Sequence, residues 1–345
     1  MKTVVLDLCE IGNPASGFGQ ICRNYARLFS QTQDPDLSFK YLVPEKYAGP
    51  LPQGEVYRVR RKFHKFFSQG LPQGDVWHCT NQQQLKRRRG SYQKLVLTIH
   101  DLNYLTEKNR LRQWKHHFIL QRAIRQAAAV TCISGFVAEQ VKQQFHLYGK
   151  PLRVIYNGVE DITSQPQQKP QWAGGRPFFF SIGQIRTKKN FHLLVDLMRH
   201  FPEYDLYICG DDHFPYSRVV REHIQSLPTQ NARLCGKISQ EEKVWLYAHC
   251  QAFLFPSVGE GFGLPVIEAM QFGKPVFIST ATCLPEIAGD AAFTWESLEP
   301  NAMAERVKQG LSAFTPMMAE HARQHAQEFS YERHIAEYLK LYNLV

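Results

Sequence analysis

The sequence predicts an α/β protein built from two doubly wound parallel sheets. Short apolar runs with the composition of buried strands alternate with helical stretches along most of the chain, as in successive βα units. This alternation runs from VVLDL (4–8) to LRVIYNGV (152–159), stops at the Pro- and Gly-rich segment 163–177, and resumes at FFFSIG (178–183). A chain of 345 residues also exceeds one ordinary core, so we expect two domains.

In the first half, each predicted strand is an apolar run that ends at polar or glycine residues. The helix expected at 20–29 places Ile21, Tyr25 and Phe29 on one side. A helix poor in acidic residues is expected at 110–126, and Ser134 is a good N-cap for a third helix. The predicted strands of this half are 4–8, 39–44, 56–59, 75–80, 94–102, 128–134 and 152–159.

The second half repeats the alternation and ends in helices. Its last segment, 301–344, has a helical pattern with no strand-like run. The predicted strands are 178–183, 204–210, 232–236, 252–256 and 275–279, and the predicted helices lie near 191–199, 217–226, 240–249 and 265–272 and after Leu284.

Composition excludes several classes of protein. No apolar run approaches the length of about 18 residues that a membrane span needs. The opening MKTVVLDLCEIG contains Asp7 and Glu10, so we interpret it as a first strand and not as a signal peptide. The eight cysteines are scattered without a C-x-x-C pattern, which favours reduced thiols in a cytoplasmic protein and no structural zinc.

The net charge of +10 is unevenly distributed. Residues 1–160 hold 24 Lys and Arg against 11 Asp and Glu, whereas the rest of the chain holds 17 against 20. The densest basic clusters are 58–65 and 86–89. They are consistent with solvated loops, or with a surface for anionic lipid headgroups or for a phosphorylated acceptor. No nucleic-acid-binding pattern accompanies them, so we expect no nucleic acid partner.

The stretch that carries the clearest chemistry is LFPSVGEGFGLPVIEAMQFGKPV (254–276). It predicts a buried strand, a glycine loop and a helix that begins near Pro265. Such a loop and helix N-terminus present backbone amides to an anion such as phosphate. Two carboxylates, Glu260 and Glu268, stand on this unit and can accept hydrogen bonds from sugar or ribose hydroxyls. An ordinary strand, turn and helix with two unrelated glutamates is the alternative.

The pattern PSxxEGFGLPxxEAMxxGxPV, with its Glu-x7-Glu pair, resembles the donor site of the retaining nucleotide-sugar glycosyltransferases of family four. Within that family it is similar to bacterial mannosyltransferases for lipopolysaccharide or capsule. The resemblance implies the GT-B fold, in which two Rossmann-like domains face each other across a cleft. We therefore expect an acceptor-binding domain at 1–162, a linker at 163–177, a nucleotide-sugar-binding domain at 178–328, and a C-terminal helix at 329–345 that crosses back to the first domain.

The resemblance also assigns roles within the motif. It implies that Glu260 holds the hydroxyls of the transferred sugar and that Glu268 holds the ribose. The backbone between them would contact the donor diphosphate, through residues Gly261, Phe262, Gly263 and Leu264.

A second expected site follows the first strand of the second half, where Gly183 ends the strand and three cations follow. A solvated loop is the alternative. The resemblance instead implies that Lys188 and Lys189 neutralise the diphosphate leaving group. Family members usually carry arginine where this chain has Lys188, so the bidentate fork is lost, and Arg186 is the candidate to supply a guanidinium.

Three further groups are nominated by the resemblance. Lys237 and Ile238, which follow the strand ARLCG, would face the nucleotide base. His100 and Asp101 end the strand TIHDL and would lie beside the sugar or acceptor, although a core histidine is the ordinary interpretation. The glycine loop GNPASGFG (12–19) would approach the donor phosphates through Gly17 and Gly19; without the resemblance it is a tight βα turn.

The resemblance implies a retaining, metal-independent glycosyltransferase. We expect it to move a hexose, with mannose from GDP-mannose first, onto a glycan or lipid-linked acceptor in the cytoplasm, with peripheral contact to an anionic membrane. No cofactor and no metal are expected, and the Asp211-Asp212 pair is discounted as a metal site. The alternatives are a UDP-hexose donor, a GT-B nucleotide-sugar epimerase, or a non-catalytic basic binding protein.

Overall fold

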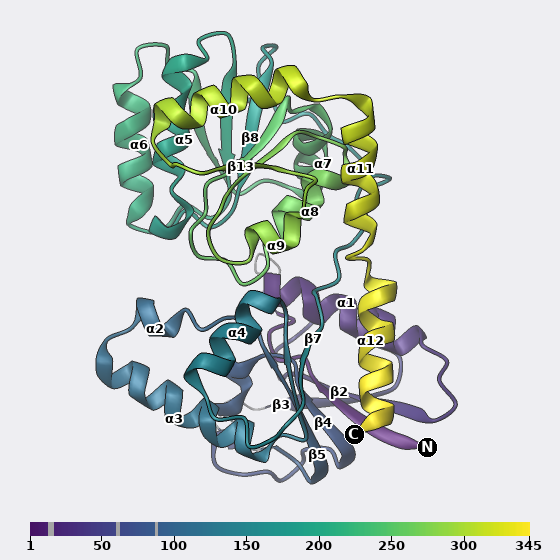
Figure 1. Ribbon diagram of the computed structural model, residues 1–345. Helices are drawn as coiled ribbons and strands as arrows, with labels where there is room; N and C mark the ends of the chain where they lie inside the picture. The colour runs from purple at the N-terminus through teal and green to yellow at the C-terminus, as the bar shows by residue number, and fades with distance from the viewer. Residues whose placement is uncertain (13–16, 60–62, 87–88) are drawn as a thin grey trace. The chain divides into compact units, whose positions relative to one another are not determined.

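The structure, a computed structural model, describes residues 1–12, 17–59, 63–86 and 89–345. It divides the chain into two compact units: unit 1 comprises residues 1–158 and 331–345, and unit 2 comprises residues 159–330. Each unit is a parallel sheet with helices packed against it (Figure 1). The predicted α/β class with two parallel sheets is therefore confirmed. In the described parts of the chain, no helix is long and apolar enough to cross a bilayer.

Unit 1 contains a seven-stranded sheet in the order β3-β2-β1-β4-β5-β6-β7. The interior strand β1 pairs Val4 with Phe39 of β2 and with Val76 of β4. The inner strands are buried on both faces and read as continuous apolar runs, as parallel sheets require. The strands are β1 Lys2–Asp7, β2 Leu37–Pro44, β3 Glu55–Val59, β4 Gly74–Cys79, β5 Tyr92–Ile99, β6 Ala129–Cys132 and β7 Leu152–Val154.

The helices of unit 1 come from both ends of the chain. The predicted bounds of α3 are confirmed, and Ser134 caps α4 by accepting a hydrogen bond from the amide of Val137. The helices are α1 Gly17–Gln31, α2 Tyr104–Glu107, α3 Arg110–Gln126, α4 Gly135–Gln144 and α12 Tyr331–Leu344, with short 3₁₀ turns at Phe63–Lys65 and Gln82–Lys86.

Unit 2 contains a six-stranded sheet in the order β10-β9-β8-β11-β12-β13. Its strands are β8 Phe178–Ile182, β9 Asp205–Cys209, β10 Ala232–Gly236, β11 Ala252–Phe255, β12 Val276–Ser279 and β13 Phe293–Trp295. Its helices are α5 Phe191–Leu197, α6 Tyr216–Ser226, α7 Gln240–His249, α8 Leu264–Gln271, α9 Leu284–Ala288, α10 Pro300–Ala313 and α11 Pro316–Gln327.

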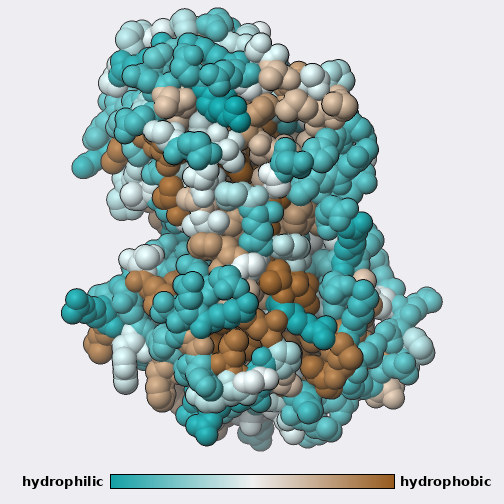
Figure 2. Space-filling model, viewed as in Figure 1, coloured by the Kyte–Doolittle hydropathy of each residue, from teal (hydrophilic) through white to brown (hydrophobic). Residues whose placement is uncertain are grey.

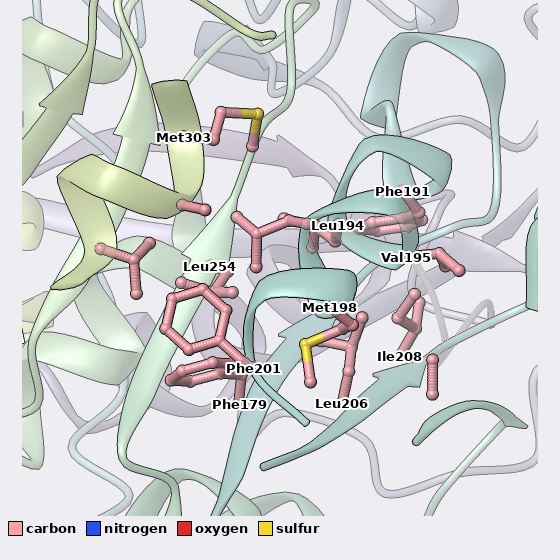
Figure 3. Close-up of a cluster of buried hydrophobic side chains, with 14 of the residues drawn as sticks. Phe179, Phe191, Leu194, Val195, Met198, Phe201, Leu206, Ile208, Leu254 and Met303 are labelled. Atoms are coloured by element: carbon pink, nitrogen blue, oxygen red, sulfur yellow. The ribbon is translucent and has the colours of Figure 1, made fainter. Parts of the chain in front are cut away.

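The core of unit 2 lies between its sheet and the helices α5 and α10. Figure 3 shows Phe179 and Leu254 from neighbouring strands meeting Leu194 of α5, with Met303 of α10 on the same cluster. These side chains are fully buried. The cluster anchors the first βα connection of the unit, which carries several of the predicted site residues.

The segment 163–177, which we expected to be the interdomain linker, packs onto unit 2. Trp172 lies against the ring of Tyr207 at 5.1 Å, and the amide of Gly174 donates a hydrogen bond to the Tyr207 hydroxyl at 2.9 Å. Arg176 pairs with Asp205 at 3.3 Å. The segment belongs to unit 2, because these contacts anchor it despite its turn-forming composition. The chain passes between the units at 158–159 and 330–331.

The helix α12 packs on the sheet of unit 1 through a buried polar network. His78 of β4 contacts the Tyr342 hydroxyl at 2.6 Å and the Thr98 hydroxyl at 2.7 Å. The Tyr338 hydroxyl also lies 2.9 Å from that of Thr98. On the same helix, His334 contacts the Tyr25 hydroxyl at 2.6 Å. Buried polar groups require such partners, so the network fixes α12 in one position on the sheet.

Both histidines of this network are held neutral. Burial lowers the pKa of His78 to about 3 and that of His334 to about 4, from an ordinary value of 6.5. The pKa of each histidine is lower in the folded state than in the unfolded state. The free energy of unfolding therefore has its full value above pH 6.5 and decreases as the pH falls below 6.5, because the unfolded chain then binds protons that the folded chain does not.

We expect unit 1 to lose stability in mild acid because of these histidines. Each adds a slope of about 1.4 kcal/mol per pH unit below its unfolded pKa. Denaturant unfolding at about pH 7.5 and about pH 5 measures the loss, and His334→Gln should reduce the difference between the two. A control variant, His321→Gln, changes a half-exposed histidine on α11. An identical pH dependence for wild type and His334→Gln would contradict this account.

Candidate active site

The strand order of unit 2 reverses once, and the reversal locates the site. The chain adds β9 and β10 on one side of β8, and then β11, β12 and β13 on its other side. The loops that follow β8 and β11 therefore leave the same sheet edge in opposite directions. Ligands of open α/β sheets bind at such a point. Gly183 and Lys189 lie in the loop after β8, and Glu260 lies in the loop after β11.

Lys189 and Glu260, both predicted as site residues, are in contact. The ammonium of Lys189 pairs with the carboxylate of Glu260 and lies 4.6 Å from the ring centroid of Phe255. The Ser257 hydroxyl donates a hydrogen bond of 2.5 Å to Oε1 of Glu260, the same oxygen that Lys189 contacts. Both side chains of the pair are largely buried, so each charge compensates the other.

Hydrogen bonds to backbone carbonyls also connect the loops after β8 and β11. The amide of Val258 donates to the carbonyl of Lys188 at 2.8 Å, and the side-chain amide of Asn190 donates to the carbonyl of Pro256 at 3.3 Å. The Lys188 side chain passes over Gly259, where a Cβ would lie only 2.7 Å from Lys188 Cδ. Lys188 therefore holds the site together through its main chain as well as adding a cation.

The glycine loop leads into α8 through a residue that only glycine accommodates well. Gly263 has a φ of +101°, and a Cβ there would lie 2.8 Å from Leu284 Cδ2. The N-cap residue Gly263 has no side chain that could cap α8. Amides in the first turn of a helix lack partners within the helix and suit an anion. The Phe262 ring, in contrast, is buried against Phe329 at 5.6 Å. Phe262 can therefore contribute to a donor site only through its backbone, next to Gly261.

Glu268 is held by two residues of α7 that the sequence analysis did not identify. Lys243 Nζ lies 2.8 Å from Oε1 of Glu268, and the Tyr247 hydroxyl donates to Oε2 at 2.9 Å. The side chains of Lys243 and Glu268 are only 11% and 12% exposed. Burial and the nearby Glu268 raise the pKa of Tyr247 well above its ordinary value. Each carboxylate oxygen keeps a second lone pair for a ribose hydroxyl.

The remaining predicted residues of unit 2 lie at the same sheet edge: Arg186 follows β8, and Lys237 and Ile238 follow β10. Lys237 is exposed and pairs with Asp211 at 3.2 Å, while the neighbouring Ile238 is half-buried. Hydrogen bonds, first from His213 and then from Lys237, lower the pKa of Asp211. The Arg186 guanidinium lies 4.4 Å over the ring of Phe214.

The two aspartates that follow β9 have basic partners. Asp211 contacts His213 and Lys237, and Asp212 contacts Arg221. Over the described ranges, no group of three or more His, Cys, Asp or Glu residues is arranged to hold a metal ion. The eight cysteines are free thiols.

In unit 1 the strand order also reverses, between β1 and β4, and its predicted residues lie near that point. Gly17 and Gly19 form the first turn of α1, which follows β1, whereas residues 13–16 of the predicted glycine loop lie outside the described residues. The ring of Phe18, between the two glycines, meets the ring of His100 edge-on at 4.8 Å. The start of α1 and the end of β5 therefore come together.

His100 is a buried, neutral histidine with a defined orientation. Its Nε2–H donates to the carbonyl of Thr80 at 2.7 Å, and burial lowers its pKa. In this tautomer Nδ1 is the unprotonated nitrogen and can accept a hydrogen bond from a hydroxyl. Asp101 accepts a hydrogen bond from the amide of Asn103 at 3.0 Å and so stabilises the turn into α2.

Four residues at the site were missed by the sequence analysis: Ser257, Thr282, Lys243 and Tyr247. Thr282 has a φ of +58°, unusual for a β-branched residue, and its hydroxyl accepts from the amide of Glu260 at 3.4 Å. Lys243 and Tyr247 are four residues apart on α7 and so share a helix face. That spacing was the available signal, but their contact with Glu268 depends on the packing of α7 near α8.

Two family models match the chain. The model for glycosyl transferases group 1 matches residues 163–328, and the model for glycosyltransferase family 4 matches residues 22–161. The chain is a family four glycosyltransferase. The resemblance that the Glu-x7-Glu motif suggested is confirmed.

Relatives of this glycosyltransferase include two proteins named as O-antigen chain mannosyltransferases. It is 25% identical to the O-antigen chain mannosyltransferase B of Escherichia coli, over 73% of this chain and 71% of that protein. It is 24% identical to the O-antigen chain mannosyltransferase RfbU of Salmonella typhimurium, over 65% of this chain and 64% of that protein.

Solved structures support the assignment of the fold. HepE of Anabaena, determined in complex with UDP and glucose, matches with a TM-score of 0.77 and 16% identity over all of both chains. The glycosyltransferase therefore has the predicted GT-B fold.

We expect Lys243 and Glu268 to be strongly coupled. Lys243→Met leaves a buried carboxylate without its cation, which should cost about 3 kcal/mol or more of unfolding free energy. Denaturant unfolding of Lys243→Met, Glu268→Gln and the double variant measures the coupling, and the double variant should be more stable than the sum of the single losses predicts. The exposed pair Lys308 and Glu305 is the control, and its coupling energy should be at most about 1 kcal/mol. Additive losses at Lys243 and Glu268 would refute the pairing.

Proposed function

We propose that this glycosyltransferase moves a hexose, with mannose from GDP-mannose as the first candidate, onto a hydroxyl of a glycan or lipid-linked acceptor. The observation that carries the proposal is the convergence at one sheet edge of Lys189, Glu260 and the N-terminus of α8. A cation and a helix N-terminus suit the diphosphate, and a carboxylate suits the sugar hydroxyls. The two curated relatives are named O-antigen chain mannosyltransferases, which supports mannose and bacterial surface polysaccharide synthesis.

The donor would be held by groups of unit 2. Glu260 is oriented by Ser257 and Lys189 through Oε1, and its Oε2 is the oxygen that we assign to the sugar hydroxyls. Glu268, fixed by Lys243 and Tyr247, would accept from the ribose. Lys237 and Ile238 would lie beside the base.

Catalysis would be mainly electrostatic. When the bond between the sugar and the diphosphate breaks, negative charge grows on the phosphate oxygens, and Lys188, Lys189 and Arg186 would stabilise it together with the amides that precede α8. Lys189 has three N–H donors and can keep Glu260 while it contacts a phosphate. We assign no covalent nucleophile, and the leaving phosphate would take the acceptor proton on the same face of the sugar, with retention. We propose that neither a metal nor another cofactor takes part.

In unit 1, His100 would contact the sugar or the acceptor. Its Nε2–H is committed to Thr80, so Nδ1 would accept from a hydroxyl. Asp101, Gly17 and Gly19 would line the same edge. A neutral histidine suits this role, because it can accept a hydrogen bond without adding charge beside a developing oxocarbenium ion.

A UDP-hexose is the second candidate donor. The observation that favours it is the solved complex of HepE with UDP and glucose, a structure with the same fold. The donor sets the base contacts but leaves the roles of Lys189 and Glu260 unchanged.

Substitution Glu260→Gln should separate chemistry from nucleotide binding. The amide keeps the shape but loses the charged contact with Lys189 and with the sugar, so transfer should fall about 100-fold, whereas affinity for the free nucleotide should change little. The transfer rate is measured with GDP-mannose and with UDP-glucose in the presence of EDTA. The nucleotide affinity is measured by calorimetric titration with GDP and with UDP. Glu305→Gln, on an exposed helix face, is the control. Undiminished transfer by Glu260→Gln, or no binding of either nucleotide to the wild type, would overturn the proposal.

A further inference from the structure

The helix α3 has apolar side chains on two opposite faces. Leu120, Ala123 and Ile124 are buried against unit 1, as expected for a helix packed on a sheet. Leu111, Trp114 and Phe118 lie on the other side and are 77%, 67% and 56% exposed. At about 100° per residue, these three positions fall within about 60° of arc, so they form one stripe. Two opposed apolar faces explain why α3 does not show the single hydrophobic face of an ordinary surface helix.

The exposed stripe is not a frayed segment. The ring of His117 stacks on Phe145 at 4.4 Å, and Gln121 exchanges two hydrogen bonds with the backbone of His146, at 2.9 and 3.0 Å. Asn109 caps the helix by accepting from the amide of Arg112. The helix is therefore held firmly, and the rings of Trp114 and Phe118 stack on each other at 5.9 Å on its outer side.

Basic residues border the stripe, and this part of the sequence contains no acidic residues. Arg122 and Arg125 continue the outer side of α3 by one and two turns. Between Glu107 and Glu139 the sequence contains six Lys and Arg residues and no Asp or Glu. We call Leu111, Trp114, Phe118, Arg122 and Arg125 the α3 outer face. In Figure 2 hydrophobic side chains interrupt the hydrophilic surface of unit 1 over α2 and α3.

A hollow adjoins this face. It has a volume of about 560 Å³ and is lined by Phe118, Gln121, Arg122, Arg125, Gln126 and Tyr148. The guanidinium of Arg125 lies 5.8 Å over the ring of Tyr148. Two guanidinium groups beside aromatic rings make a site for a phosphate on a molecule that also has an apolar part.

We infer that the α3 outer face docks on an anionic lipid bilayer. Trp114, Phe118 and Leu111 enter the boundary between headgroups and acyl chains, where aromatic side chains are favoured, and Arg122 and Arg125 bind lipid phosphates from the hollow. The charge of the segment complements an anionic membrane surface. This contact goes beyond the proposed transfer reaction and involves none of its residues.

Other occupants fit the face less well. A second copy of the chain would place arginine against arginine across a symmetric interface, which is repulsive. A nucleic acid would engage Arg122 and Arg125 but would leave Leu111 in water.

Exposed rings also accompany the basic cluster at 58–65, at Phe63, Phe66 and Phe67. Residues 60–62 of that cluster lie outside the described residues, and Arg58 donates to the carbonyls of Glu45 and Tyr47. In the cluster at 86–89, residues 87–88 lie outside the described residues, and Arg89 lies over Tyr92 with its Nε donating a hydrogen bond to the Tyr92 hydroxyl.

Vesicle sedimentation of the full chain tests the inference. Wild type should bind vesicles of phosphatidylglycerol and phosphatidylcholine at low salt, and should bind phosphatidylcholine alone much more weakly. Trp114→Ser with Phe118→Ser, and separately Arg122→Glu with Arg125→Glu, should each weaken binding by about tenfold or more. The matched controls are Met317→Ser, at a residue of unit 2 that is 78% exposed, and Arg218→Glu on α6, and they should bind as wild type.

Two further measurements keep the outcomes distinct. Vesicles should shift the tryptophan emission of wild type to shorter wavelength, and the shift should be absent in Trp114→Phe. Nucleotide binding by all variants should match wild type, which shows that they are folded. The inference fails if wild type does not bind the anionic vesicles. It also fails if neither variant loses binding. If only the arginine variant loses binding, the inference fails as well, because the face is then a site for a polyanion such as a nucleic acid.

Discussion

The reversal of strand order in each sheet is the constraint on which the site depends. A parallel sheet directs the carboxyl ends of its strands to one edge, and the reversal opens a space between the loops after β8 and β11. Everything that suits a diphosphate and a sugar in unit 2 follows from this: a cation after β8, a carboxylate after β11, and the N-terminus of α8 beside them. Without the reversal, Lys189 and Glu260 would not meet.

Buried polar contacts orient the two carboxylates at this edge. Lys189 with Glu260 and Lys243 with Glu268 are buried ion pairs, and each fixes a carboxylate in one orientation. Such pairs add little net stability, but an unpaired partner is costly, so they favour one arrangement over others. The network of His78 and His334 does the same for α12, which returns the end of the chain to unit 1.

Much of the fold and part of the site could be predicted from the sequence, for physical reasons. Apolar runs predicted the strands, because the burial of a strand depends on its own residues, and the bounds expected for α3 were correct. Glu260 was found because its neighbours form a dense local motif. The contact of Lys243 with Glu268 joins two helices, and Trp172 packs from a Pro- and Gly-rich segment onto Tyr207 of β9. Neither contact has a local sequence pattern. The exposed stripe with Leu111 and Trp114 could not be predicted from the sequence, because the opposite face of α3 is also apolar.

Hydrogen exchange with and without donor tests the central claim most directly. The claim is that the donor binds at the edge where Lys189 and Glu260 meet. Saturating GDP-mannose, or UDP-glucose if that is the donor, should slow exchange in residues 183–190 and 257–268, because the ligand covers the loops after β8 and β11 and the start of α8. Protection confined to other segments of unit 2, or no protection with a donor that the enzyme demonstrably uses, would contradict the account.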